Sequence, residues 1–182
     1  MRARLLAFLV ACLGLACVGP AKNGIWLDVP YVRQPQNGCG AACIVMVMRY
    51  WVRKDPQFHC RVPAIEALQR TLYRPRARGI FASDMVDYLR REGFRVFAFR
   101  GAWSDLSEHL AKGRPLIVCL RQGGLDRSRH YVVVVGLDPA RGLVLVNDPA
   151  RRKLAMVARA TFSRQWSAAQ NWTLLAVPAS NN

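Results

Sequence analysis

A cysteine flanked by glycines opens an apolar segment in the first third of the sequence. Cys39 lies in the run Q-P-Q-N-G-C-G-A-A-C, where turn-forming residues precede it and small residues follow it. This pattern predicts that Cys39 lies at or near the N-terminus of a helix. Unpaired backbone N–H groups and the positive end of the helix dipole favour the thiolate, which is the nucleophilic form of cysteine. The pattern indicates a reactive thiol, and the alternative is a buried structural cysteine in a tight turn.

A nucleophilic cysteine needs a base, and the sequence contains three histidines. His59 lies in a predicted loop, and His109 lies in a charged helical stretch. His130 follows the Gly123-Gly124 loop and directly precedes five apolar residues, which places its imidazole at the start of a predicted strand. His130 is therefore the candidate base, and the alternative is a half-buried histidine at a strand end.

An orienting carboxylate would hold the imidazole in the tautomer that can accept the thiol proton. Two candidates follow His130, and each precedes a proline: Asp138 and Asp148. If the chain forms a hairpin around a turn at 138–142, Asp138 lies about 26 Å from His130 along the strand, at about 3.3 Å per residue. Asp148 returns beside the start of the same strand and lies diagonal to His130. Geometry thus selects Asp148 as the partner and leaves Asp138 as a turn residue.

The helices that would position Cys39 lie mostly in the first half of the chain. The segment from about 40 to 52 is apolar nearly all round, which is typical of a central, buried helix. Ser83 and Ser104 are the predicted N-caps of two other helices, Pro63 suits a first turn, and Gly93 ends a helix. The predicted helices run over about 40–52, 62–73, 83–93, 104–113 and 161–166.

Short apolar, β-branched segments dominate the second half of the chain and predict buried strands. An additional extended arm is expected near the N-terminus, where Pro30 restricts it to a sheet edge. Helices first and an antiparallel sheet later make an α+β arrangement. The predicted extended segments are 25–32, 94–99, 116–120, 131–135, 143–146 and 172–177.

The first 21 residues have the pattern of an export signal. Met1-Arg2-Ala3-Arg4 is a positive segment, and Leu5 to Val18 is apolar but too short for a membrane span. We therefore expect residues 1–21 to be a signal peptide, possessing either a lipoprotein-type or an ordinary cleavage site, and 22–182 to form a single domain. Lipid attachment would use Cys12 or Cys17, and simple cleavage would follow Ala21. The protein is then expected in the periplasm, the cell envelope or outside the cell.

The chain is strongly basic. Its formal net charge is +16, and removal of Arg2 and Arg4 with the signal would leave +14. The basic residues are scattered, and no nucleic-acid-binding motif accompanies them, so we expect a solvated basic face rather than a nucleic-acid partner. An anionic envelope surface is a further candidate partner. Membrane contact is expected only through an N-terminal lipid anchor.

The remaining cysteines bear on both disulfides and metals. Outside the signal these are Cys39, Cys43, Cys60 and Cys119. A free nucleophile leaves room for one disulfide at most, for which Cys43–Cys60 is the least implausible pair, with Cys119 buried in a strand. There is no C-x-x-C pair, so no structural zinc site and no other cofactor is expected.

Three motifs in order resemble a known family. The runs Q-P-Q-N-G-C-G-A-A-C, H-Y-V-V-V-V-G and V-L-V-N-D-P-A are similar to those of the bacteriocin-processing peptidases and their stand-alone relatives, within the papain-like cysteine peptidases. The match extends to the C-terminal run W-T-L-L-A-V-P. The resemblance implies a papain-like α+β fold in which the nucleophile helix packs on a C-terminal antiparallel sheet. It also implies that Cys39 is the nucleophile, His130 the general base and acid, Asp148 its orienting residue and Gln34 an oxyanion-hole donor.

The sequence departs from this family in two respects. The family's glutamine usually lies six residues before the nucleophile, where this chain has Arg33, and Gln34 and Gln36 lie closer to Cys39. The best-known members precede an ATP-driven peptide exporter and cut after a double-glycine leader on the cytoplasmic side. The signal of this chain points outward, so double-glycine specificity is not expected to carry over.

The sequence supports one main hypothesis and two alternatives. The main hypothesis is an exported cysteine peptidase that hydrolyses peptide or protein substrates. One alternative is a catalytically silent module that binds a peptide or an envelope component in the same groove. The other is a thiol-dependent acyl transferase, because the same three residue types serve both reactions.

The export hypothesis makes a prediction about the mature N-terminus. Protein recovered outside the cytoplasm should begin at Cys17 with a lipid or near Lys22 without one, because both signals end in small residues at that distance. N-terminal sequencing and intact mass measure this. Cytoplasmic protein that retains Met1 to Arg4 would contradict the export hypothesis.

Overall fold

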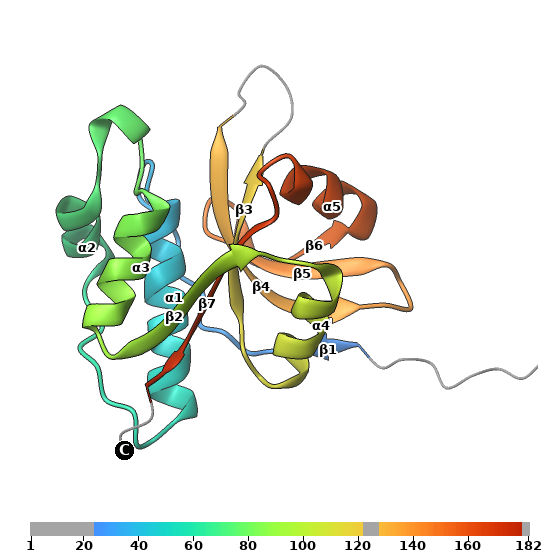
Figure 1. Cartoon of the computed structure of the whole chain (residues 1–182), viewed down its shortest axis with the longest axis horizontal. Helices are drawn as coiled ribbons and strands as arrows, with labels where there is room; N and C mark the ends of the chain where they lie inside the picture. The colour runs from blue at the N-terminus through green and yellow to red at the C-terminus, as the bar shows by residue number, and fades with distance from the viewer. Residues whose placement is uncertain (1–23, 122–127, 180–182) are drawn as a thin grey trace, which may run out of the picture.

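The computed structural model describes residues 24–121 and 128–179, so the predicted signal peptide and the Gly123-Gly124 loop lie outside the described residues. Helices dominate the first part, and strands dominate the second (Figure 1). The elements are β1 (Ile25–Trp26), α1 (Cys39–Lys54), α2 (Ile65–Leu72), a 3₁₀ helix (Pro75–Ala77), α3 (Ala82–Arg91), β2 (Phe94–Arg100), α4 (Trp103–Ala111), β3 (Leu116–Arg121), β4 (Arg129–Asp138), β5 (Leu143–Asp148), β6 (Arg152–Ala158), α5 (Arg159–Ser167) and β7 (Trp172–Pro178).

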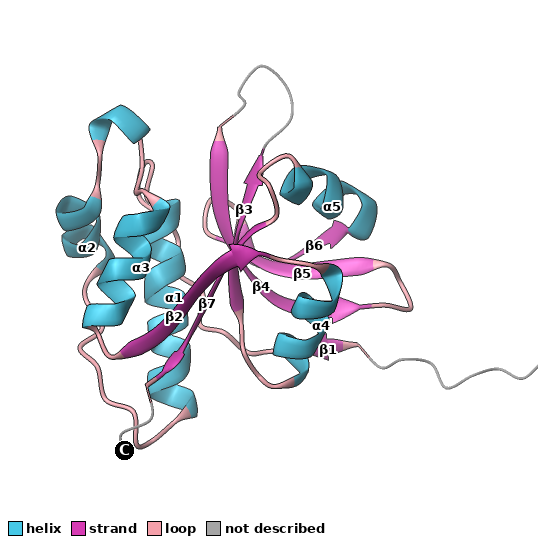
Figure 2. Ribbon diagram, in the orientation of Figure 1, coloured by secondary structure: helices cyan, strands magenta, loops and turns pink. Residues whose placement is uncertain are grey.

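One sheet organises the described chain. Its strands pair antiparallel in the order β2-β7-β3-β4-β5-β6, and β1 pairs with the far end of β4. Helices α1, α2 and α3 lie on one side of the sheet, and α4 and α5 lie on the other (Figure 2). This arrangement confirms the predicted α+β class, with the first helices packed on a later antiparallel sheet.

Alternation along β4 divides the apolar side chains between two cores. Val133 and Val135 pack with α1 and its neighbouring helices, whereas Val132 and Val134 pack with α4 and α5. Successive side chains of a strand point to opposite faces, so a strand that is covered on both faces must be apolar throughout. This requirement explains the continuous valine run that follows His130.

Helix α1 is the most deeply buried helix, as its apolar sequence predicts. Every residue from Gly40 to Tyr50 except Arg49 is buried, and α1 contacts α2, α3 and β4. Gly38 precedes the helix and provides no capping side chain. A Cβ at Gly38 would come within 2.6 Å of Gln69 Oε1 and 2.8 Å of Pro35, so only glycine fits this close approach.

The helix starts differ from the sequence predictions by one or two residues. Phe81 and Ala102 are the residues that cap α3 and α4, so Ser83 and Ser104 lie inside the helices and the predicted serine caps are wrong. At α4 the side chain of Asp105 accepts a hydrogen bond from the Ala102 N–H at 2.6 Å. A carboxylate in the first turn thus takes over the role of the cap. Pro63 lies before α2 rather than in its first turn.

All four cysteines in the described residues are free thiols, so the Cys43–Cys60 pairing is wrong. Cys43 is fully buried in the second turn of α1. Cys60 is half-buried and lies in the segment between α1 and α2.

None of the helices in residues 24–121 and 128–179 has the length and apolar character of a membrane span. In the same residues, no three His, Cys, Asp or Glu side chains gather in a way that could hold a metal ion.

The contact between β1 and β4 depends on Gly136, which pairs with Trp26. A Cβ on Gly136 would lie 2.5 Å from the Ile25 carbonyl oxygen, so Gly136→Ala must push β1 away. We expect a loss of about 1–3 kcal/mol in the free energy of unfolding, measured by urea denaturation. Gly79→Ala is the matched control, because the nearest atom to its Cβ lies at 3.8 Å. Equal effects of the two substitutions would contradict this account.

Candidate active site

Cys39 is the first residue of α1, as predicted, and it is partly exposed. Its thiol lies near the side chain of His130 and the backbone of Tyr131, and both groups lower its pKa. No acidic residue lies in the first turn of α1. The unpaired N–H groups of the helix N-terminus are therefore free to favour a negative charge on sulfur.

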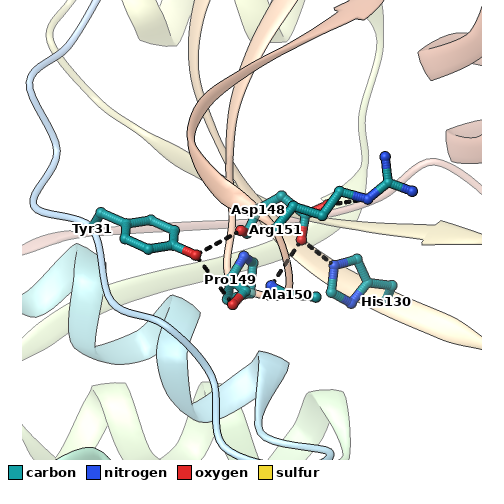
Figure 3. Close-up of polar contacts among 6 residues, drawn as sticks. All are labelled: Tyr31, His130, Asp148, Pro149, Ala150 and Arg151. Atoms are coloured by element: carbon teal, nitrogen blue, oxygen red, sulfur yellow. Dashed lines mark hydrogen bonds and ion pairs between the residues drawn. The ribbon is translucent and has the colours of Figure 1, made fainter.

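His130 lies at the start of β4 and contacts the predicted carboxylate. Its Nε2 lies 2.7 Å from Asp148 Oδ1, and each of the two residues is 8% exposed (Figure 3). Val133 pairs with Asn147 across β4 and β5, which brings Asp148 back to the beginning of β4. The hairpin prediction is confirmed. Asp138 lies at the far end, where its Oδ1 accepts a hydrogen bond from the Arg141 N–H at 3.0 Å in a turn.

Other groups hold Asp148 in place. Its Oδ1 accepts a second hydrogen bond from the Ala150 N–H at 3.0 Å, and Arg151 Nε lies 3.6 Å from Oδ2. The hydroxyl of Tyr31 donates to the carbonyl oxygens of Asp148 and Pro149, at 3.2 and 3.3 Å (Figure 3). The turn after β5 is thereby fixed to the N-terminal arm, so the carboxylate has little freedom to turn away from the imidazole.

Asn147 is a supporting residue that the sequence reasoning missed. It is fully buried, and its Nδ2 donates to the Val29 carbonyl at 3.0 Å while its Oδ1 accepts from the Leu154 N–H at 3.0 Å. These bonds connect β5 to the N-terminal arm and to β6 at the point where the pairing register shifts. The polar pair Asn147-Asp148 at the end of an apolar strand was the available signal. Tyr31 and Arg151 gave no comparable signal.

Gln34 lies beside the same turn. Its backbone N–H donates to the Pro149 carbonyl at 3.0 Å, and its side-chain Oε1 is buried and has no hydrogen-bond partner in the described residues. Arg33 and Gln36 are exposed. Gln34 is therefore the one of these three residues whose side chain turns inward, and it lies next to the residues that hold Asp148.

The three central groups shift one another's pKa values. Burial raises the pKa of Cys39, but hydrogen bonds from His130 and the Tyr131 and Gly40 backbone outweigh it and lower the pKa below its usual value. Burial lowers the pKa of His130, but hydrogen bonds with Asp148 and Cys39 raise it to about 9. Burial raises the pKa of Asp148, and the His130 bond and charge lower it overall. The favoured state is a thiolate, an imidazolium and a carboxylate.

The raised pKa of His130 has a consequence for stability. A group whose pKa is higher in the folded state stabilises that state fully below its unfolded pKa, which is about 6.5 for histidine. This contribution is lost as the pH rises through the folded pKa of about 9.

The other thiols lack this environment. Burial raises the pKa of Cys60 and of Cys119 to about 11 in each case. Burial also raises the pKa of Cys43 well above its usual value. Among the thiols of the described residues, Cys39 is the one whose pKa is lowered, so the structure separates it chemically from its neighbours.

A cleft elsewhere on the described chain lies away from these residues. It has a volume of about 800 Å³ and is lined by β2, β7 and parts of α1 and α4. Trp51 in its wall is twelve residues along α1 from Cys39, about 18 Å at about 1.5 Å per residue. A smaller cavity adjoins His130 and Asp148. The candidate active site is therefore identified by the residues whose pKa values are shifted, and not by the size of a cleft.

The sequence model of the Peptidase_C39 like family matches residues 26–173, which include every residue placed at this site. The chain belongs to this family. The predicted resemblance to C39-type peptidases is thus confirmed. Among curated proteins, none matches the sequence.

Solved structures show the same fold. A protein from Bacillus anthracis described as a C39-like peptidase has a TM-score of 0.70 at 15% identity, over 87% of this chain and 100% of that chain. A double glycine motif protease from an AMS/PCAT transporter, in complex with its leader peptide, has a TM-score of 0.62 at 22% identity, over 85% and 94%. The peptidase domain of Streptococcus ComA has a TM-score of 0.62 at 21% identity, over 81% and 97%. The fold is papain-like, as predicted.

The contact between His130 and Asp148 predicts a specific titration. Asp148→Asn should lower the pKa of His130 below about 9, because it removes the charge and the acceptor that raise this pKa and leaves burial, which lowers it. NMR titration of the imidazole measures the change. Asp138→Asn is the matched control and should leave the pKa of His130 unchanged. An unchanged pKa in Asp148→Asn would contradict the assignment.

Proposed function

We propose that this chain is a cysteine peptidase whose reaction uses Cys39, His130 and Asp148. One observation carries the proposal: the imidazole of His130 lies 2.7 Å from the Asp148 carboxylate and also interacts with the Cys39 thiol, whose pKa it lowers. Asp148 occupies Nε2, so Nδ1 is left to exchange a proton with the thiol. An imidazole in this position can accept the thiol proton and return a proton to a leaving group.

The proposed reaction begins with attack by the Cys39 sulfur on the carbonyl carbon of a peptide bond. The carbonyl oxygen becomes an anion, and His130 transfers its proton to the leaving nitrogen as the C–N bond breaks. The acyl group stays on Cys39 as a thioester. Water, deprotonated by His130, then releases the second product and restores the thiol.

The oxyanion needs hydrogen-bond donors within reach of the developing charge. We assign this role to the N–H at the start of α1 and to the side chain of Gln34. The inward position of Gln34, beside Pro149, supports this choice over the exposed Arg33 and Gln36. Pro35 and Gly38, which lie between Gln34 and Cys39, would make the connecting turn one residue shorter than in the family pattern.

The proposed substrate is a peptide or protein. The AMS/PCAT relative was solved in complex with a leader peptide, and this supports a peptide substrate for the common fold. Export of this chain, through the signal-like residues 1–21, remains part of the proposal and distinguishes its substrates from those of a transporter-bound domain. No metal or organic cofactor enters any step.

The proposed function is tested by comparing two thiols of the same chain. Near pH 7, iodoacetamide should label Cys39 and leave Cys60 unlabelled, because the pKa of Cys39 is lowered and that of Cys60 is raised to about 11. Cys39→Ala should abolish peptide hydrolysis, and Cys60→Ala should retain it. Mass spectrometry of the labelled protein and a peptide-cleavage assay measure these outcomes.

The pH profile of hydrolysis belongs to the same test. The rate should fall in acid as the Cys39 thiolate is protonated, and fall again as His130 loses its proton near pH 9. Full hydrolysis by Cys39→Ala, or equal labelling of Cys39 and Cys60, would contradict the proposed function.

A further inference from the structure

A cavity of about 280 Å³ lies beside the His130–Asp148 pair, between the sheet and α5. Its apolar lining includes Leu120, Val132 and Val146. Leu120 pairs with His130 across β3 and β4, and Val132 lies two residues further along β4 on the same face. The lining therefore starts at the imidazole and continues into the core beneath it.

The opposite wall comes from α5 and the end of β6. Thr161 and Gln165 are four residues apart on α5 and therefore lie on the same side of the helix. Val157 on β6 is half-buried and completes the wall. The neighbouring Met156 is 53% exposed and does not line the cavity.

The position of the cavity relative to Cys39 indicates which part of a peptide substrate the cavity would contact. His130 and Asp148 line the cavity, and Cys39 does not. In the proposed mechanism His130 gives its proton to the leaving nitrogen, so that nitrogen must lie within hydrogen-bond distance of the imidazole. The side chain nearest to the cavity is then that of the first residue after the cleaved bond.

The size and charge of the cavity restrict what it can hold. Pockets for drug-sized ligands have volumes of about 300–1,000 Å³, so 280 Å³ suits a single side chain. Arg151 also lines the cavity, its side chain is 74% exposed, and His130 carries a second positive charge when protonated. Asp148 balances only one of these two charges. Aliphatic side chains fit the apolar part of the lining, which Leu120, Val132, Val146 and Val157 form, and lysine or arginine would meet the like charge of Arg151 and His130.

We propose that this cavity selects the first residue on the leaving-group side of the cleaved bond, that it takes an aliphatic side chain, and that it rejects lysine and arginine. The proposal rests on the cysteine peptidase function proposed above. It assigns Val157, Thr161 and Gln165 to substrate selection. These residues would contact the part of the substrate that follows the cleaved bond.

The test is cleavage of a mixed peptide library, with the products sequenced by mass spectrometry. The wild-type protein should prefer Val, Leu or Met over Gly at the first position after the cleaved bond by at least about tenfold, as expected for added methylenes in an apolar pocket. Val157→Phe should fill the cavity and shift the preference to Gly and Ala. Met156→Phe is the matched control and should cleave like the wild type.

Val157→Ala provides a second variant in case Val157→Phe fails to fold, which circular dichroism would reveal. It enlarges the cavity and should extend the preference to Phe. Cleavage with no preference at this position, or with the wild-type preference in the folded Val157 variants, would overturn the pocket and leave the peptidase function intact. Absence of any cleavage by the wild type would overturn the proposed function itself, and the pocket with it.

Discussion

The hydrogen bond between His130 and Asp148 is the interaction on which the other features of the site depend. Both residues are almost fully buried, and a buried charge is tolerated only when it is paired and hydrogen-bonded. The carboxylate therefore keeps the imidazole protonated, and the imidazolium in turn favours a thiolate on Cys39. Loss of one partner would leave the other as an uncompensated buried group. The three side chains consequently act as one unit, with pKa values that none of them would have alone.

This unit is assembled where two layers of the fold meet. Cys39 comes from the N-terminus of a helix in the layer on one side of the sheet, whereas His130 and Asp148 come from the ends of adjacent strands. The segment that contains Val29 and Tyr31 connects α1 to the strand ends. Tyr31 donates to the carbonyls of Asp148 and Pro149, and Asn147 donates to the carbonyl of Val29. The same segment also carries Gln34 to this turn. The segment before Cys39 thus stabilises the Asp148 turn and is also a candidate source of an oxyanion donor.

Comparison with solved structures distinguishes the features of the common fold from the side chains that are particular to this chain. Solved structures at 15–22% identity share the fold of this chain. One wall of the cavity beside His130, by contrast, comes from side chains on α5 and the end of β6, at the edge of the sheet. The residues of this wall can therefore differ among proteins of the same fold, since binding sites are built on folds and not dictated by them.

The sequence by itself determined the buried helix after Cys39, the valine-rich strands and the choice of Asp148 over Asp138, because periodicity and hairpin length are local properties of the chain. It did not predict β6, whose basic residues Arg152 and Lys153 obscure the alternation until β5 supplies an edge for pairing. Nor did it predict the caps of α3 and α4, since a first-turn carboxylate and the packing of neighbouring elements replaced the serines. Only the tertiary structure decided that Gln34 turns inward, that Tyr31 and Asn147 hold the Asp148 turn, and that a cavity opens beside His130. These features arise from contacts between residues more than one hundred positions apart, or between different layers, and a local pattern such as the polar Asn147 at the end of an apolar strand does not specify the bonding partners.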